Sequence, residues 1–210
     1  MIECRLFILG DDAVGIQPAD RQLRHALALS LRETCEWVDV VPGKEFIAAQ
    51  FNPFDIRPSE AIRKMEAWLS TFQEKADSSY APVDLHLDVS NDRAPDLGAL
   101  AAENNLSEEE FLEKVAQSEL IIDMLGFMPG FAYVEGVDEV LTGERLAVPR
   151  QRVEAGSVGF VSGQLGLYGL SGPGGWPIIG RLTETLFDPA RDDPFLLREG
   201  QLIRLKLVGA

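Results

Sequence analysis

The chain has 210 residues, of which 46% are hydrophobic and 25% charged, and its formal net charge is −15. These proportions are typical of a soluble globular protein with one or two domains, and they exclude a collagen-like, disordered or membrane class. The negative charge disfavours binding to nucleic acid or to an anionic membrane surface, because both repel an acidic protein.

The sequence predicts a cytoplasmic protein without a metal of its own. Cys4 and Cys35 are too few and too far apart for a disulfide framework, so we expect reduced thiols. The N-terminus lacks a signal-peptide pattern, and no apolar run approaches the ~18 residues that span a bilayer. His25 and His86 belong to no H-E-x-x-H motif, so we expect ordinary surface or core-edge histidines.

The first part of the chain alternates strand patterns with amphipathic helical patterns. One helix is predicted in the segment that Asp20 opens and another after the N-cap residue Ser59, since apolar residues then recur at helical intervals. Strands are predicted at residues 2–9, 13–17, 37–41, 46–51 and 83–89, with a hairpin at Gly10-Asp11-Asp12. This order indicates an α+β, ferredoxin-like domain with an extra hairpin strand, occupying residues 1–88.

The second part, residues 89–210, changes character. A short helix is predicted at 96–103, and Ser107 with Glu110 forms a capping box before a second helix. Most of the glycines then fall between residues 126 and 180, where they separate short β-type segments. Strands are predicted at residues 157–161, 165–168, 177–179 and 202–208. Short strands bounded by glycine favour a compact β-barrel.

Four segments, residues 126–133, 147–152, 162–168 and 173–181, combine glycine or proline with polar or aromatic side chains. Glycine lets a ligand approach the backbone, and Arg150 and Arg181 are suited to holding a carboxylate or another anionic group. Each feature also has an ordinary structural interpretation: a tight turn at Gly174-Gly175, a core or rim position for Trp176, and surface charge for the arginines. A phosphate-binding P-loop, a G-x-S-x-G nucleophile elbow and a G-x-G-x-x-G dinucleotide motif are all missing from the sequence.

The ordered motifs of the second half carry a family resemblance. The segment 126–133 reads Gly-Phe-Met-Pro-Gly-Phe-Ala-Tyr, and it is followed by Pro149-Arg150, Gly-Ser-Val-Gly at 156–159, Gln164-x-Gly-x-Tyr168, Pro-Gly-Gly-Trp at 173–176 and Gly180-Arg181. This series resembles the family whose members are named the B subunit of 5-oxoprolinase, allophanate hydrolase subunit 1 or the sporulation kinase A inhibitor KipI. The similarity extends into the first half through Gly-Asp-Asp-Ala at 10–13 and residues 38–42.

The resemblance implies a cyclophilin-like barrel after the α+β domain, and partners for the chain. These are a subunit 2 homologue, similar to the C subunit of 5-oxoprolinase, with which a composite site forms, and a third oxoprolinase subunit. The complex would use ATP to open 5-oxoproline to glutamate, while this chain alone binds no cofactor. The catalytic residues stay unassigned, and the candidates for the composite site are Pro129, Arg150, Gln164, Tyr168, Ser171, Gly174, Gly175, Trp176 and Arg181.

Two functions of different classes remain open from the sequence. In the first, the chain is a non-autonomous enzyme subunit that acts on a lactam or amide, with Arg150 and Arg181 holding an anionic group and Gln164 and Tyr168 orienting the amide. In the second, it is a binding module that inhibits a sporulation-type histidine kinase through the barrel face. A related protein that binds a metabolite without turnover is a third, simpler alternative.

Overall fold

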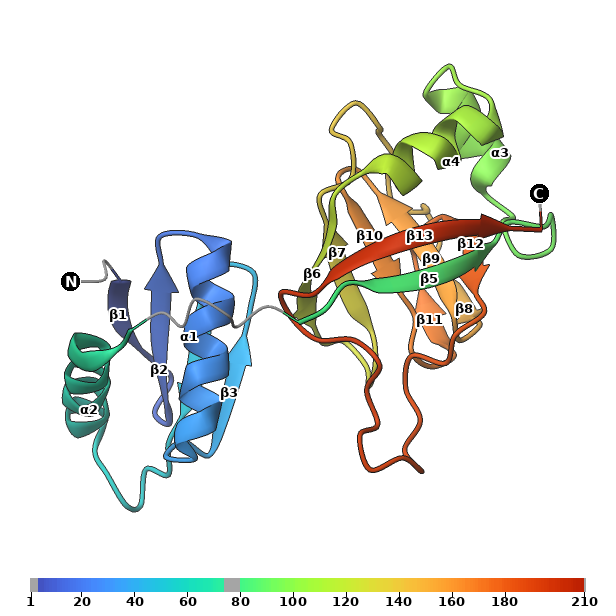
Figure 1. The fold of residues 1–210 in the computed structure, drawn as a ribbon. Coiled ribbons are helices and arrows are strands. Elements are labelled where there is room, and N and C mark those ends of the chain that lie inside the picture. The colour runs from blue at the N-terminus through green and yellow to red at the C-terminus, as the bar shows by residue number, and fades with distance from the viewer. Residues whose placement is uncertain (1–3, 74–79, 210) are drawn as a thin grey trace. The chain divides into compact units, whose positions relative to one another are not determined.

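A computed structural model of the chain describes residues 4–73 and 80–209. The chain forms two compact units, Met1–Ser78 and Ser79–Ala210, and each has its own hydrophobic core (Figure 1). None of the helices in the described ranges combines the length and apolar character that crossing a bilayer requires.

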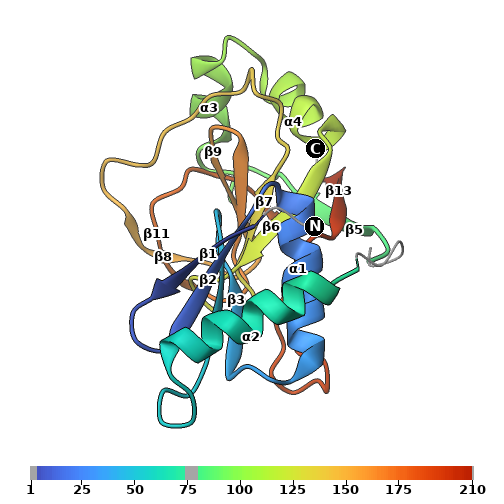
Figure 2. The ribbon, with the colours of Figure 1, turned by 90° about the vertical axis from the view of Figure 1, so that its left-hand side faces the viewer.

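The first unit is a four-stranded antiparallel sheet in the order β1-β2-β4-β3, with two helices packed on it. The core lies between sheet and helices, where Val14, Ile16 and Ile47 of the strands meet Leu27 and Met65 of the helices. Figure 2 shows α2 crossing the strands. The elements are β1 (Cys4–Leu9), β2 (Ala13–Pro18), α1 (Arg21–Thr34), β3 (Asp39–Pro42), β4 (Ile47–Gln50) and α2 (Pro58–Thr71).

The two helices begin in different ways. The helix predicted to open at Asp20 is confirmed, and the Asp20 side chain is its N-cap, accepting a hydrogen bond from the Leu23 N–H at 2.8 Å. The predicted N-cap Ser59 of α2 is wrong, because the cap is Arg57. Pro58 takes the first helical position, where its missing N–H costs nothing, and Glu60 accepts a bond from the Arg57 N–H at 2.9 Å.

A second correction concerns the strand predicted at 83–89, which was expected to complete the first domain. It is β5 (Val83–Asp88), and it belongs to the barrel of the second unit. It pairs in parallel with β13 (Leu202–Val208), so that Val83 faces Ile203 across the ladder. Its other neighbour is β12 (Ile178–Leu182).

Within residues 80–209, seven strands close a barrel in the order β10-β7-β6-β13-β5-β12-β9. A separate ribbon of two strands, β8 and β11, completes the β-structure of this part. The α+β class and the barrel predicted from the sequence are confirmed. The remaining strands are β6 (Leu120–Leu125), β7 (Ala132–Glu135), β8 (Arg150–Val153), β9 (Ser157–Val161), β10 (Gln164–Leu167) and β11 (Gly172–Gly174).

Both predicted helices of the second unit are present, as α3 (Leu97–Glu103) and α4 (Glu108–Gln117). The capping box is also confirmed, since Ser107 and Glu110 exchange hydrogen bonds of 3.1 and 2.8 Å. Phe111 of α4 is fully buried and meets Phe160 of β9 edge to face, with ring centroids 5.2 Å apart. The two helices therefore share the core of the barrel.

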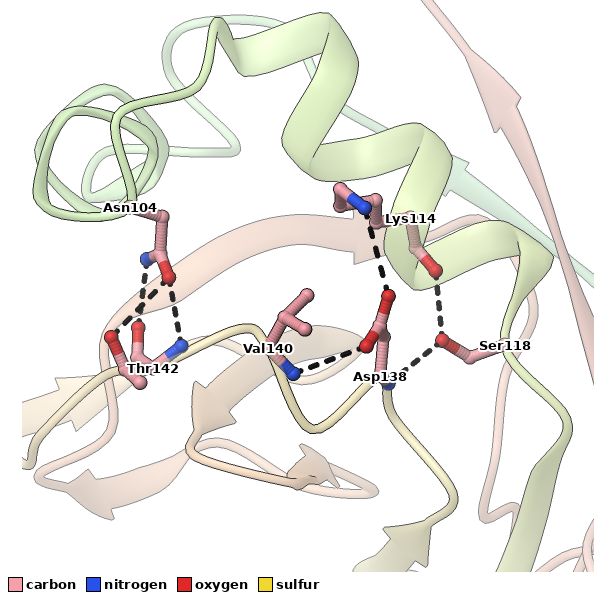
Figure 3. Close-up of polar contacts among 6 residues, drawn as sticks. All are labelled: Asn104, Lys114, Ser118, Asp138, Val140 and Thr142. Atoms are coloured by element: carbon pink, nitrogen blue, oxygen red, sulfur yellow. Dashed lines mark hydrogen bonds and ion pairs between the residues drawn. The ribbon is translucent and has the colours of Figure 1, made fainter.

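Polar contacts fasten these helices to the loop of residues 136–143 (Figure 3). Asn104 donates to the Thr142 carbonyl and accepts from the Thr142 N–H, both at 2.8 Å. Ser118 donates to the Lys114 carbonyl at 2.8 Å and accepts from the Asp138 N–H at 3.0 Å. The Lys114 ammonium lies 3.7 Å from the Asp138 carboxylate. Asn104 thus replaces the backbone partner that Thr142 would have in a strand.

We predict that Asn104→Ala lowers the free energy of unfolding by about 1–3 kcal/mol, because the Thr142 amide and carbonyl lose their partner. Urea denaturation measures the change. Glu103→Ala, one residue earlier and exposed, is the matched control and should change stability by less than about 0.5 kcal/mol. Equal effects of the two variants would contradict a fastening role for Asn104.

Candidate functional site

Along strands β7, β9 and β10, successive side chains point alternately to the two faces of the sheet. Ala132, Val134, Val158, Phe160, Leu165 and Leu167 enter the large core. The intervening residues face the other way, and there Gly166 pairs with Tyr133 on one side and with Gly159 on the other. The opposite face of these strands therefore has two adjacent positions without a side chain.

Aromatic rings occupy the space that these glycines leave. A Cβ on Gly166 would lie 2.8 Å from Phe131 Cζ and 3.1 Å from Trp176 Cε3. A Cβ on Gly159 would lie 2.8 Å from Trp176 Cβ. Real Cβ atoms do not approach so closely, so both rings need glycine in order to rest on the strand backbone.

The rings form an aromatic cluster of Phe127, Phe131, Tyr133, Tyr168 and Trp176. Phe131 meets Tyr133 and Tyr168 edge to face, at centroid distances of 4.8 and 5.0 Å. Tyr133 meets Trp176 at 6.1 Å, and Phe127 meets Phe131 at 5.3 Å. Tyr168 and Trp176 are 2% and 7% exposed, whereas Phe127 is 62% exposed. The cluster thus runs from a buried interior to a solvent-facing ring.

The β8–β11 ribbon passes over Tyr168. Gly172 pairs with Val153 and Gly174 with Arg150. The Tyr168 hydroxyl reaches the backbone of Gly174, since a Cβ there would lie 2.2 Å from Oη. Beside it, the Gly175 carbonyl accepts a hydrogen bond of 2.7 Å from the Leu146 N–H.

Two guanidinium groups flank this region in different ways. Arg145 lies over the Trp176 ring, with its Cζ 5.8 Å from the centroid, which is a cation–π arrangement. Arg150 forms an ion pair of 2.8 Å with Asp96, whose other oxygen accepts a 2.6 Å hydrogen bond from the Ile178 N–H. The Nη1 of Arg150 is buried and has no hydrogen-bond partner among the described residues.

A second polar group surrounds Glu154. Its carboxylate bonds Arg152 at 2.7 Å and accepts from the Ser171 hydroxyl at 3.2 Å. The hydrogen bond from Arg152 is the main cause that holds the pKa of Glu154 below its usual value, and Arg181 adds a smaller electrostatic effect in the same direction. Arg181 lies beside Gly156, and its buried Nε lacks a partner in the described part of the chain.

The structure brings together a part of the predicted site. Tyr168, Gly174 and Trp176 lie within or against the aromatic cluster, Arg150 and Gly175 adjoin it through the ribbon, and Pro129 is in the turn before Phe131. Gln164 precedes Gly166 by two residues on the same face of β10, and its amide donates to Glu135 at 3.1 Å. Ser171 and Arg181 belong instead to the Glu154 group. The binding roles of these residues remain predictions.

The candidates predicted from the sequence do not include five side chains of the cluster and its flanks, namely Asp96, Phe127, Phe131, Tyr133 and Arg145. Phe127, Phe131 and Tyr133 lie within the segment 126–133, and the two-residue spacing of Phe131 and Tyr133 is the signal in the sequence that places both on one face of a strand. The sequence places Asp96 at the start of a predicted helix, and nothing local indicates its pairing with Arg150. The residues in the described ranges include no group of three or more His, Cys, Asp or Glu side chains placed to hold a metal ion.

Comparisons with known proteins agree with this architecture. Residues 5–197 match the family model "carboxyltransferase domain, subdomain C and D". The chain is 33% identical to the B subunit of 5-oxoprolinase from Escherichia coli O157:H7, over 97% of this chain and 96% of that protein. The solved structure of TTHA0988 is similar with a TM-score of 0.78 at 26% identity, over 99% of this chain and 40% of the other. This chain therefore spans less than half of TTHA0988.

One further structure bears on the fold alone. The urea amidolyase of K. lactis matches with a TM-score of 0.71 at 16% identity, over 99% of this chain and 15% of that enzyme.

We predict that Gly174→Ala lowers the free energy of unfolding by about 1–3 kcal/mol, because the new methyl group would collide with the Tyr168 hydroxyl. Gly175→Ala is the matched control, since its methyl group would lie 3.5 Å from Pro149, an ordinary contact. Urea denaturation compares the two variants. Equal stabilities would show that Tyr168 does not press on the ribbon.

We also predict that ionisation of Tyr168 lowers the free energy of unfolding at alkaline pH. Burial raises its pKa, and Tyr133 adds to the rise, so the folded state favours the neutral phenol. The stabilisation is complete below the unfolded-state pKa of about 10 and is lost as the pH rises through the folded-state pKa. Urea midpoints measured across this range should fall less steeply for Tyr168→Phe than for the wild type. Tyr80→Phe, at an exposed position, should follow the wild type.

Proposed function

Since the chain belongs to the family described as "carboxyltransferase domain, subdomain C and D", we propose that it is a non-autonomous subunit of an ATP-dependent 5-oxoprolinase complex. The observation that carries the proposal is the 33% identity to the B subunit of 5-oxoprolinase over nearly the whole of both chains. In this proposal a subunit 2 homologue forms a composite site with this chain, and a third subunit is needed for the full complex. The complex uses ATP, and water breaks the lactam C–N bond of 5-oxoproline to give glutamate.

The aromatic cluster supplies the apolar part of the proposed site. A five-membered lactam offers methylene groups. The Trp176 ring is fixed by close packing on glycine backbone, and the Tyr133 ring meets it at a centroid distance of 6.1 Å. A rigid wall loses little entropy when a ligand binds, which favours positioning.

Arg150 supplies the proposed contact to the substrate carboxylate. Asp96 holds its Nη2, while the buried Nη1 still has a hydrogen to donate. A carboxylate bound there would satisfy this donor with a charge-assisted hydrogen bond. Arg181 has a comparable buried Nε, beside Gly156 and within electrostatic reach of Glu154. We assign it the second anion contact.

Gln164 and Tyr168 are proposed to orient the amide. The Gln164 amide is held by Glu135, which fixes which way it points. Tyr168 is a neutral phenol, and burial raises its pKa further above the ordinary value. A neutral phenol and an amide N–H both donate to a carbonyl oxygen, where negative charge develops during amide opening. We also propose a cytoplasmic setting, in which the free thiols of Cys4 and Cys35 stay reduced.

We predict that Arg150→Ala lowers kcat/KM for 5-oxoproline-dependent ATP hydrolysis by about 10²-fold in the complex reconstituted with the subunit 2 homologue and the third subunit. Arg152→Ala is the matched control, because Arg152 is on the same strand, pairs with Glu154 and is largely exposed. Urea denaturation of each variant separates lost activity from unfolding, since Arg150→Ala also frees Asp96.

Full activity of a folded Arg150→Ala complex would rule out the proposed role of Arg150. If the wild-type chain forms no complex with the subunit 2 homologue and instead captures a histidine kinase, the oxoprolinase function itself is wrong. A complex that forms but hydrolyses no ATP with 5-oxoproline would point to another amide substrate.

A further inference from the structure

The loop between β4 and α2 presents a phenylalanine to solvent on a hydrogen-bonded turn. Phe54 is 97% exposed. Its N–H donates to the Asn52 side chain at 3.1 Å, and the Asn52 amide donates to Asp55 at 2.8 Å. The Asn52 carbonyl accepts from the N–H groups of Asp55 and Ile56 at 3.0 and 3.2 Å. The turn is thus closed on itself, and it holds an apolar ring away from the core.

This turn adjoins the end of the sheet that carries the Gly-Asp-Asp-Ala motif. Register aligns Leu9, Ala13, Gln50 and Asp39 across all four strands, so β1 and β4 end where β2 and β3 begin. The loop of residues 51–57 projects from this end in Figure 1. The Asp12 carbonyl accepts from the Phe51 N–H at 2.8 Å, and the Asp12 carboxylate accepts from Gln50 at 2.7 Å. The motif therefore braces the turn that presents Phe54.

The same end of the sheet exposes further apolar and acidic side chains. Leu9 and Val38 are 37% and 65% exposed, and the Val38 N–H bonds the Gln50 carbonyl at 2.8 Å. The acidic side chains Asp11, Asp39 and Asp55 are exposed there, and Arg57, two residues after Asp55, is also exposed. We name this set of apolar and acidic residues at 9–12, 38–39 and 54–55 the sheet-end surface.

We propose that the sheet-end surface docks the subunit 2 homologue, with the Phe54 ring inserted into an apolar pocket rimmed by Lys or Arg. An aromatic ring on a rigid turn loses little freedom when it is buried, which is the property of an interface anchor. The acidic rim selects a basic partner surface and repels a second copy of this chain, whose net charge is −15. The identity of the occupant rests on the proposed function, whereas the surface itself is a property of the first unit.

The test measures binding of the full chain to the purified subunit 2 homologue from the same organism by isothermal titration calorimetry. Phe54→Ala should raise the Kd by about 30-fold or more, as truncation of an interface anchor does. It removes no hydrogen bond of the turn, because Phe54 contributes its backbone N–H. Val140→Ala, at a 64% exposed position in the second unit, is the matched control and should leave the Kd unchanged.

Charge reversal gives a second, independent measurement. Asp11→Lys should weaken binding, and its effect should diminish as salt is added, because the rim acts through screened electrostatics. Wild-type binding with an unchanged Kd for Phe54→Ala would overturn the docking surface and leave the proposed function intact. Failure of the wild-type chain to bind the subunit 2 homologue would overturn the proposed function and this occupant together.

Discussion

Aromatic rings that lie directly on strand backbone are the constraint on which the outer face of the second unit depends. Phe131 and Trp176 need Gly166 and Gly159 beneath them, and Tyr168 needs Gly174 above its hydroxyl. Each glycine is costly to the strand that contains it, because it weakens the ladder and buries no side chain. The large apolar core on the other face of the same strands compensates for that loss. The aromatic cluster is consequently rigid, and its shape is fixed by backbone positions.

Asp96 ties this cluster to the rest of the unit. Although it precedes α3, its side chain makes no capping bond to that helix. One oxygen holds Arg150 of β8, and the other accepts from the Ile178 N–H of β12. A single carboxylate therefore links the start of the helices, the ribbon and the barrel. In the proposed site, a ligand carboxylate would share the Arg150 guanidinium with Asp96, which weakens the contact. It would also accept a hydrogen bond from the Arg150 Nη1, which Asp96 leaves unpaired.

The sequence predicts helices and strands correctly where neighbouring residues determine them. It does not predict which strands or side chains pair when the partners are far apart in the chain. Flanking glycines located β9, alternation located β13, and the Ser107–Glu110 capping box located α4. The same alternation identified β5 as half-buried without revealing its partner, since a period of two describes faces and not neighbours. For the site, glycine-rich segments pointed to the correct region. These segments do not indicate that Asp96 forms an ion pair with Arg150 or that Arg181 interacts electrostatically with Glu154.

The two units contribute different kinds of interaction to the proposed complex. In the second unit, Arg150 and Gln164 already have partners, and Tyr168 is buried, so ligand contacts there depend on a few remaining donors and on exact geometry. Such contacts give orientation more than affinity. In the first unit, Phe54 is almost fully exposed, and its burial against the proposed partner would supply affinity without specific chemistry. In the proposed complex, this separation would let the chain bind its partner tightly while its ligand contacts stay weak enough to release product.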